Sequence, residues 1–248
     1  MTPSHARLAA RNEDAARGTT AGDILIEWAR RTPYRIALTE AGARGAPSRS
    51  WTCEALRDDA ATLAVALLSR FAPGERIAVW APPCPEGVLL QFAAAFAGLT
   101  LAMIDPACDV GDLPRILDHS GAAGLFMMTG KGGRASARRA ASRADALREV
   151  VDLADRWALF AKRRCVDGLP DVRPGDPAQI RYAASGSGPP RGEMVPHGDL
   201  ANALRGAISG GRPRGDALLP YFPKDPQSGR AAAVPAGSTR VARVAAVA

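Results

Sequence analysis

Residues 76–104 read RIAVWAPPCPEGVLLQFAAAFAGLTLAMI, and this stretch decides the fold. The short apolar runs at 76–80 and 100–104 have the length of buried strands. Between them, Pro85 stands at a first helical turn, where no backbone N–H is needed, and Gly98 marks the end of that helix. A strand, a helix and a second strand in this order form a unit with parallel strands. The stretch therefore predicts a parallel sheet covered by helices.

The rest of the chain continues this alternation in both directions. Thr20 and Asp23 have the spacing of a capping box, Pro33 ends the helix that they begin, and Thr52 caps a second helix. Further strands are expected at 35–39, 124–128, 149–153 and 180–183, further helices at 112–119, 157–162 and 199–208, and a turn-rich link at 42–50. The predicted fold class is α/β, with a mainly parallel sheet and helices on both faces.

The composition narrows the class of protein. The 248 residues are 47% hydrophobic but only 5% aromatic, so we expect a core of Ala, Val, Leu and Ile. The sequence contains no run of about 18 apolar residues, so no membrane span is expected. Residues 1–20 lack the apolar segment of a secretory signal. The four cysteines are widely spaced without a CxxC pair, which argues against a metal site or a disulfide framework and fits the reducing cytoplasm.

The net charge of +7 raises the question of nucleic-acid binding. The cations are mostly arginines spread along the chain, and the densest cluster lies at 131–143. That cluster has no aromatic residues between its cations on which bases could stack. We therefore expect a solvated loop or helix surface there, and no nucleic-acid partner.

A glycine-rich loop at 182–192 reads YAASGSGPPRG and carries the candidate chemistry. Glycine allows close backbone approach, backbone N–H groups and serine hydroxyls can surround an anion, and Arg191 adds a fixed positive charge. These are the features of a phosphate cradle. An ordinary Gly/Pro surface loop between two strands has the same composition, so composition leaves both interpretations open.

Several segments resemble the AMP-forming adenylate synthetases, a family that includes the acyl-CoA synthetases. The family's phosphate loop reads roughly Tyr-Thr-Ser-Gly-Thr-Thr-Gly-x-Pro-Lys-Gly, with a His a few residues later. The positions of this sequence that fall on the pattern are Tyr182, Gly188, Pro190, Arg191, Gly192 and His197. The segments 77–86, 88–98, 104–107, 176–180 and 220–222, and the helix start at Trp51, also look like family segments in the same order.

The resemblance implies a two-step reaction. A carboxylate attacks the α-phosphate of ATP, Mg-pyrophosphate leaves, and the CoA thiol then attacks the acyl-adenylate to give a thioester. It therefore implies ATP, Mg²⁺ and CoA as cofactors and a carboxylic acid, fatty-acid-like or aromatic, as substrate. By position, the residues expected to contact the ATP phosphates are Ser185, Gly186, Ser187, Gly188, Arg191 and Gly192. His197 would line the acyl or nucleotide pocket, with a surface-strand histidine as the alternative, and no metal ligand is assigned.

The sequence also departs from the family pattern. Ala183 and Ala184 replace hydroxyl residues, the next glycine is displaced, and Arg191 stands where the family keeps Lys. Arg is a planar fork and Lys a point charge, so this exchange changes the geometry of a phosphate contact.

The resemblance covers only the N-terminal part of a family member. We expect a disordered N-terminal arm at 1–19, a truncated AMP-binding subdomain at 20–222 and a degenerate C-terminal tail at 223–248, with a last strand possible at 240–248. Two alternatives to an active synthetase follow. The chain is a catalytically inactive remnant, or it is one half of a split enzyme that a complementary chain completes.

Overall fold

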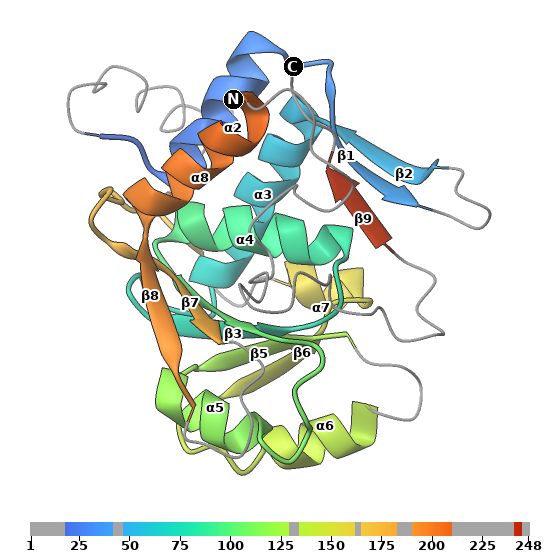
Figure 1. Ribbon diagram of the computed structural model, residues 1–248, viewed down its shortest axis with the longest axis vertical. Helices are drawn as coiled ribbons and strands as arrows, with labels where there is room; N and C mark the ends of the chain where they lie inside the picture. The colour runs from blue at the N-terminus through green and yellow to red at the C-terminus, as the bar shows by residue number, and fades with distance from the viewer. Residues whose placement is uncertain are drawn as a thin grey trace.

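The computed structural model describes residues 18–41, 47–128, 134–161, 165–182, 190–209 and 241–244. These residues form a six-stranded main sheet and a three-stranded small sheet. The main sheet lies between two layers of helices, and the small sheet lies beside the larger layer (Figure 1). The expected α/β class, with a mainly parallel sheet and helices on both faces, is confirmed.

The main sheet has the strand order β6-β5-β3-β4-β7-β8. Its strands are β3 (Arg76–Trp80), β4 (Thr100–Ile104), β5 (Gly124–Met127), β6 (Glu149–Asp152), β7 (Pro177–Tyr182) and β8 (Gly192–Pro196). The first five strands in this order run parallel, and β8 runs antiparallel to β7. The strands β3, β4, β5 and β6 lie within one residue of the predicted ranges, whereas β7 begins three residues earlier than the sequence predicts.

The helices divide between the two faces of this sheet. The larger layer holds α2 (Ala21–Arg31), α3 (Cys53–Leu68), α4 (Pro85–Ala97), α7 (Arg156–Phe160) and α8 (His197–Ser209), and the smaller holds α5 (Leu113–Ser120) and α6 (Arg134–Ala141). Each layer packs on its own cluster of buried apolar side chains. Figure 1 shows α5 and α6 on the face of the sheet opposite α3 and α4. The Arg-rich cluster forms part of α6, with Arg138 and Arg139 exposed, as expected for a solvated helix surface.

The central unit β3-α4-β4 forms as its sequence predicts. Pro85 occupies the first turn of α4, and Gly98 ends the helix in the left-handed conformation with φ 63°. Glycine is favoured there because a side chain is strained at positive φ. Every residue of α4 is buried, and the helix packs mainly on α3 and also contacts α2. A helix whose side chains are nearly all apolar, with Glu86 and Gln91 as the polar exceptions, fits this position between other elements.

Side-chain caps fix where the first two described helices begin. Thr20 accepts a hydrogen bond from the Asp23 backbone N–H, and the Asp23 carboxylate accepts one from the Thr20 backbone N–H, which confirms the predicted capping box. Thr52 accepts from the backbone N–H of Ala55 and caps α3. Each cap satisfies backbone donors that have no partner within the helix.

The small sheet differs from what the sequence predicts. It contains β1 (Ile36–Ala41), β2 (Pro47–Thr52) and β9 (Val241–Val244), in the order β2-β1-β9. The prediction of a turn-rich link at 42–50 was wrong in part, because residues 47–50 belong to β2. The polar sequence of β2 carries little strand signal, and pairing with β1 supplies the backbone hydrogen bonds that stabilise it. The strand β9, within the range expected to be a tail or a last strand, pairs antiparallel with β1.

Other sequence-based expectations lie outside the described residues. They are most of the N-terminal arm, the family-like segment at 220–222, and the loop residues Ser185, Gly186, Ser187 and Gly188. Within the described residues, no helix is both long and apolar enough to cross a membrane.

Candidate active-site edge of the main sheet

The candidate site lies where the parallel strands of the main sheet end. The last residues of β6, β5, β3, β4 and β7 pair with one another across the sheet, and they are Asp152, Met127, Trp80, Ile104 and Tyr182. The strand β3 lies between β4 and β5 in the sheet. The chain leaves β3 through α4, on one face of the sheet, to reach β4, and it leaves β4 through α5, on the opposite face, to reach β5. This reversal makes β3 and β4 a topological switch point, and open α/β sheets bind ligands outside the carboxyl ends of their strands at such points.

The two ends of the glycine-rich loop meet at this edge. Tyr182 ends β7, Gly192 begins β8, and these two residues pair directly across the two strands. A Cβ atom at position 192 would stand 2.6 Å from Cγ2 of Ile180 and 2.9 Å from Cζ of Tyr182. The Tyr182 ring therefore occupies the space that a side chain at 192 would need. The loop between them, residues 183–189, lies outside the described residues.

Tyr182 also contacts α5 in the smaller helix layer. Nδ1 of His119, in the last turn of α5, lies 2.7 Å from the Tyr182 hydroxyl, a hydrogen bond in which either group can donate. The two rings pack edge to face with centroids 5.6 Å apart. Tyr182 is only 2% exposed. This burial raises the pKa of its phenol, and the nearby Arg76 charge lowers it by a smaller amount. Sequence reasoning missed His119, because its position next to Tyr182 depends on the pairing of distant strands.

Arg191 follows the loop and is exposed. It forms no ion pair within the part of the chain that the structure describes. Gly192 comes next, with Tyr182 packed against it. These two predicted site residues therefore lie together at the carboxyl edge of the sheet.

His197 is buried, whereas Arg191 and Gly192 are exposed. It is the first residue of α8 and is fully buried, and its backbone N–H donates to the Asp176 carbonyl oxygen at 3.0 Å. The alternative of a surface-strand histidine was therefore wrong. The chain passes directly from β8 into α8, and the backbone N–H groups of His197 and Gly198 donate to the carbonyl oxygens of Asp176 and Pro174, which holds the start of α8 against residues 174–176.

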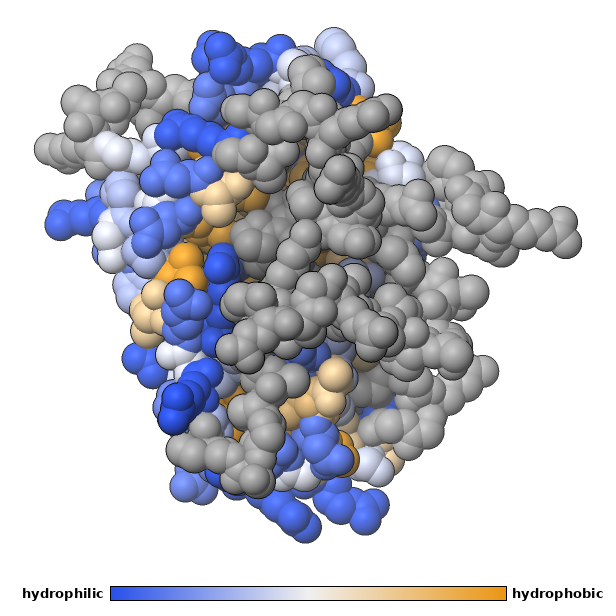
Figure 2. Space-filling model, in the orientation of Figure 1, coloured by the Kyte–Doolittle hydropathy of each residue, from blue (hydrophilic) through white to orange (hydrophobic). Residues whose placement is uncertain are grey.

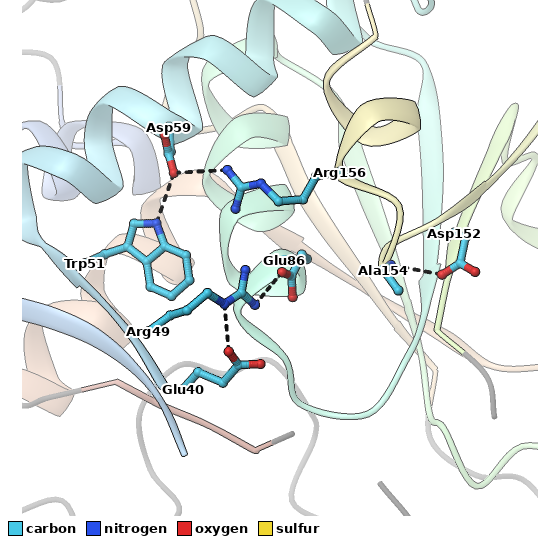
Figure 3. A network of polar contacts seen from close by, with 8 residues as sticks. All are labelled: Glu40, Arg49, Trp51, Asp59, Glu86, Asp152, Ala154 and Arg156. Atoms are coloured by element: carbon cyan, nitrogen blue, oxygen red, sulfur yellow. Dashed lines mark hydrogen bonds and ion pairs between the residues drawn. The ribbon is translucent and has the colours of Figure 1, made fainter. Parts of the chain in front are cut away.

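A buried charge network links the small sheet to the carboxyl edge. Arg49 on β2 donates to Glu40 on β1 at 2.7 Å and to Glu86 in the first turn of α4 at 2.6 Å (Figure 3). Both carboxylates are almost fully buried, with side chains 4% and 2% exposed. The hydrogen bond to Glu40 raises the pKa of Arg49, burial lowers it by a smaller amount, and Glu86 raises it further. The guanidinium also lies 5.1 Å from the Trp51 ring centroid.

The network continues toward the end of β6. The Trp51 indole N–H donates to Asp59 of α3 at 3.0 Å, and the same carboxylate oxygen lies 3.7 Å from Arg156 at the start of α7 (Figure 3). Asp152, the last residue of β6, accepts from the Ala154 backbone N–H at 2.9 Å and forms an ion pair with Arg134. Sequence reasoning missed this network, although a glutamate in the first turn of an otherwise apolar α4 is a signal that could have indicated it.

The loop after β4 has its own side-chain support. The Asp105 carboxylate accepts from the Ala107 backbone N–H at 2.8 Å and closes an Asx turn. Cys108 follows, and burial together with Asp112, Asp105 and Asp109 raises the pKa of its thiol to about 11. Among the described residues, no group of three or more His, Cys, Asp or Glu side chains could hold a metal ion, so we assign no magnesium ligand.

The sequence of residues 25–224 matches the family described as AMP-binding enzyme. The chain belongs to the AMP-binding enzyme family. This match includes both β3-α4-β4 and the glycine-rich loop, so it covers the switch point and the candidate site together. The resemblance to AMP-forming synthetases is confirmed at the level of the family.

Similar proteins of the AMP-binding family have more than one activity. The chain is 28% identical to phosphinothricin tripeptide synthetase PhsC from Streptomyces viridochromogenes over 197 residues, 79% of this chain and 17% of that protein. It is 25% identical to the acyl-CoA ligase sidI from Aspergillus fumigatus over 179 residues, 62% of this chain and 30% of that protein. One of these two proteins is a tripeptide synthetase and the other an acyl-CoA ligase, so the comparison leaves the substrate of this chain open.

The fold matches that of a solved fatty-acid-CoA ligase. A long-chain-fatty-acid-CoA ligase from Archaeoglobus fulgidus superposes with a TM-score of 0.64 at 19% identity, covering 78% of this chain and 40% of that one. The chain thus spans less than half the length of each of these three proteins.

Proposed function

We propose that this chain binds the triphosphate of Mg-ATP at the carboxyl edge of its main sheet and contributes this site to the adenylation of a carboxylic acid. The observation that carries the proposal is the direct pairing of Tyr182 with Gly192 on β7 and β8, next to β4 of the switch point. This pairing brings the two ends of the family's phosphate loop together, with the exposed charge of Arg191 beside them. Phosphate oxygens are good partners for such a charge and for backbone N–H groups.

The proposed reaction has two steps. An acid carboxylate oxygen attacks the α-phosphorus of ATP, the bond to the β-phosphate oxygen breaks, and pyrophosphate leaves with an acyl-adenylate remaining. A thiol sulfur then attacks the acyl carbon and AMP leaves, which gives a thioester. Negative charge develops on the phosphate oxygens in the first step, and fixed donors aimed at these oxygens lower its barrier. We assign this part to Ser185, Gly186, Ser187, Gly188, Arg191 and Gly192, and a pocket-lining position to His197.

We propose a fatty-acid-like substrate and CoA as the thiol, in the cytoplasm. The support is the likeness to an acyl-CoA ligase in sequence and to a fatty-acid-CoA ligase in fold. The likeness to a peptide synthetase supports an amino acid instead. A panel of acids therefore has to include both classes.

The loop sequence favours a second candidate. Ala183 and Ala184 remove two hydroxyls from the family pattern. In addition, phosphate contacts without further nucleotide contacts orient ATP poorly, and orientation supplies much of the rate in a two-substrate reaction. In this candidate the chain is inactive by itself, either as a remnant or as one half of an enzyme that a complementary polypeptide completes.

The experiment is exchange of labelled pyrophosphate into ATP by the purified chain, with fatty, aromatic and amino acids as substrates. Acid-dependent exchange that Arg191→Ala abolishes supports adenylation by this chain. The matched control is Arg139→Ala, which removes an equally exposed arginine on α6 and leaves the exchange rate unchanged. If no acid supports exchange but the chain still binds Mg-ATP, the second candidate is correct.

A further inference from the structure

Tyr182 is the residue at which the sheet ends and the glycine-rich loop begins. Its ring lies against the backbone of Gly192, so one side chain contacts both ends of the loop. A rotation of this ring would open space at position 192 and remove one of the two side chains that pack there, the other being Ile180. The orientation of the Tyr182 ring therefore adds a side-chain restraint to the strand pairing that brings the ends of the loop together.

The hydroxyl of the same ring is held by His119, which lies in the last turn of α5 in the smaller helix layer. Nδ1 of His119 lies 2.7 Å from the hydroxyl oxygen, and the edge-to-face contact of the rings adds a second restraint. The sequence separation of 63 residues makes this a tertiary contact between α5 and β7.

His119 is not one of the residues that pack α5 against the sheet. Leu113, Ile116 and Leu117 are buried and hold α5 against the sheet, and Gly121 ends the helix in the left-handed conformation. His119 itself is an exposed residue of the last turn. Its hydrogen bond to Tyr182 is thus a contact that α5 does not need for its own packing.

We propose that His119 is a positioning residue for the phosphate loop. Its hydrogen bond fixes the Tyr182 ring against Gly192 and so holds the two ends of the loop at the separation that phosphate binding requires. This inference rests on the proposed function for its effect on ATP, but its effect on the β7–β8 pair stands independently.

The test compares His119→Ala, Tyr182→Phe and the double variant. Tyr182→Phe keeps the ring on Gly192 and removes only the hydroxyl, so it also serves if His119→Ala fails to fold. Amide hydrogen exchange of residues 192–196 reports the pairing of β8, and calorimetric titration with Mg-ATP reports the affinity. His119→Asn keeps a hydrogen-bonding atom near the position of Nδ1. The control is Arg115→Ala, which removes another exposed side chain of α5.

We expect faster exchange in β8 and an ATP affinity about threefold to tenfold lower in both single variants, as the loss of one hydrogen bond predicts. The double variant should be no worse than either single variant, because both remove the same bond. His119→Asn should restore most of the affinity, Arg115→Ala should resemble the unchanged chain, and exchange in α3 should not change.

The outcomes separate the two proposals. Unchanged β8 exchange in Tyr182→Phe and His119→Ala, or additive effects in the double variant, would overturn the role of His119. Lower ATP affinity without faster β8 exchange would overturn it as well. Faster, non-additive exchange in a chain that binds no Mg-ATP supports the restraint on the loop ends and contradicts the proposed function.

Discussion

At the scale of single residues, Gly192 shows how one missing side chain shapes the candidate site. A methyl group at this position would stand 2.6 Å from Ile180 Cγ2 and 2.9 Å from the Tyr182 ring. We predict that Gly192→Ala lowers the free energy of unfolding by about 1–3 kcal/mol, because it overpacks the β7–β8 contact. Urea unfolding measures this. Gly175→Ala is the control, since nothing lies within 4 Å of a Cβ there, and an equal loss in both variants would refute the packing argument.

The buried phenol of Tyr182 makes the free energy of unfolding fall at high pH. Burial raises the pKa of its phenol above the ordinary value of 10.0. As pH rises, the unfolded chain therefore loses this proton first, and the folded state holds more protons between the two pKa values. Stability from this group is fully present below about pH 10 and is lost as pH rises through the folded pKa.

The measurement is the urea midpoint at about pH 8 and about pH 11, on either side of the ordinary tyrosine pKa. Tyr182→Phe should lose less stability between these two values than the unchanged chain, since it lacks the ionising group. All other titrating groups are the same in the two proteins. Equal losses in both would mean that the Tyr182 phenol is not buried as the structure has it.

Single residues also show the limits of sequence reasoning at the site. Arg191 and Gly192 were predicted from the pattern of the loop, and the structure gives Gly192 a packing reason that the pattern does not contain. His119 has no sequence signal, because its role depends on the alignment of α5 with the end of β7. His197 was predicted as a site residue from its position, but its full burial could not be predicted without knowing how the start of α8 packs on residues 174–176.

At the scale of elements, the Arg49 network decides how the small sheet and α4 fit together. Removing Arg49 leaves the carboxylates of Glu40 and Glu86 buried without their shared cation. We predict that Arg49→Met lowers the free energy of unfolding by about 3–5 kcal/mol, as expected when one partner of a buried ion pair is lost. Chemical denaturation is the measurement.

Two further variants make this prediction specific. Arg31→Ala removes an exposed i,i+4 pair with Glu27 and should cost only about 0.3–0.5 kcal/mol. Adding Glu40→Gln and Glu86→Gln to Arg49→Met should recover part of the loss, because the two buried charges that Arg49 had paired are then gone. The account of the network is wrong if Arg49→Met is no more costly than Arg31→Ala.

The elements themselves were predictable to different degrees. The centre of the fold was predicted almost residue by residue, because α4 begins at Pro85, ends at Gly98 and lies between two short apolar strands. The strand β2 was missed because its sequence PSRSWT has neither an apolar run nor a clear alternation. Its pairing with β1 is a tertiary interaction that local sequence does not encode.

At the scale of the whole molecule, the order of the strands explains why distant segments form one candidate site. The loop ends at Tyr182 and Gly192, the loop after β4 and the first turn of α4 all follow the carboxyl ends of parallel strands, and the pairing register aligns these ends. The other elements hold this edge in place. The small sheet does so through Arg49, and α5 does so through His119.

One edge of the main sheet is open among the described residues. The strand β8 is the last in the order, and Met194 on it is 47% exposed. Apolar surface shows beside hydrophilic surface over the region of β8 in Figure 2. An exposed edge strand can pair with another chain. We predict concentration-dependent association in analytical ultracentrifugation, which Met194→Lys reduces. A monomer at every concentration would contradict this prediction.

The central claim is that the edge formed by Tyr182, Arg191 and Gly192 binds the phosphates of ATP. Isothermal titration of the chain with Mg-ATP, with inorganic tripolyphosphate as competitor, tests it most directly. We predict saturable binding that tripolyphosphate displaces, an affinity about tenfold lower in Arg191→Ala, as expected for one lost charge-assisted hydrogen bond, and no change in Arg139→Ala. No binding, or equal affinity in Arg191→Ala and Arg139→Ala, would contradict the claim.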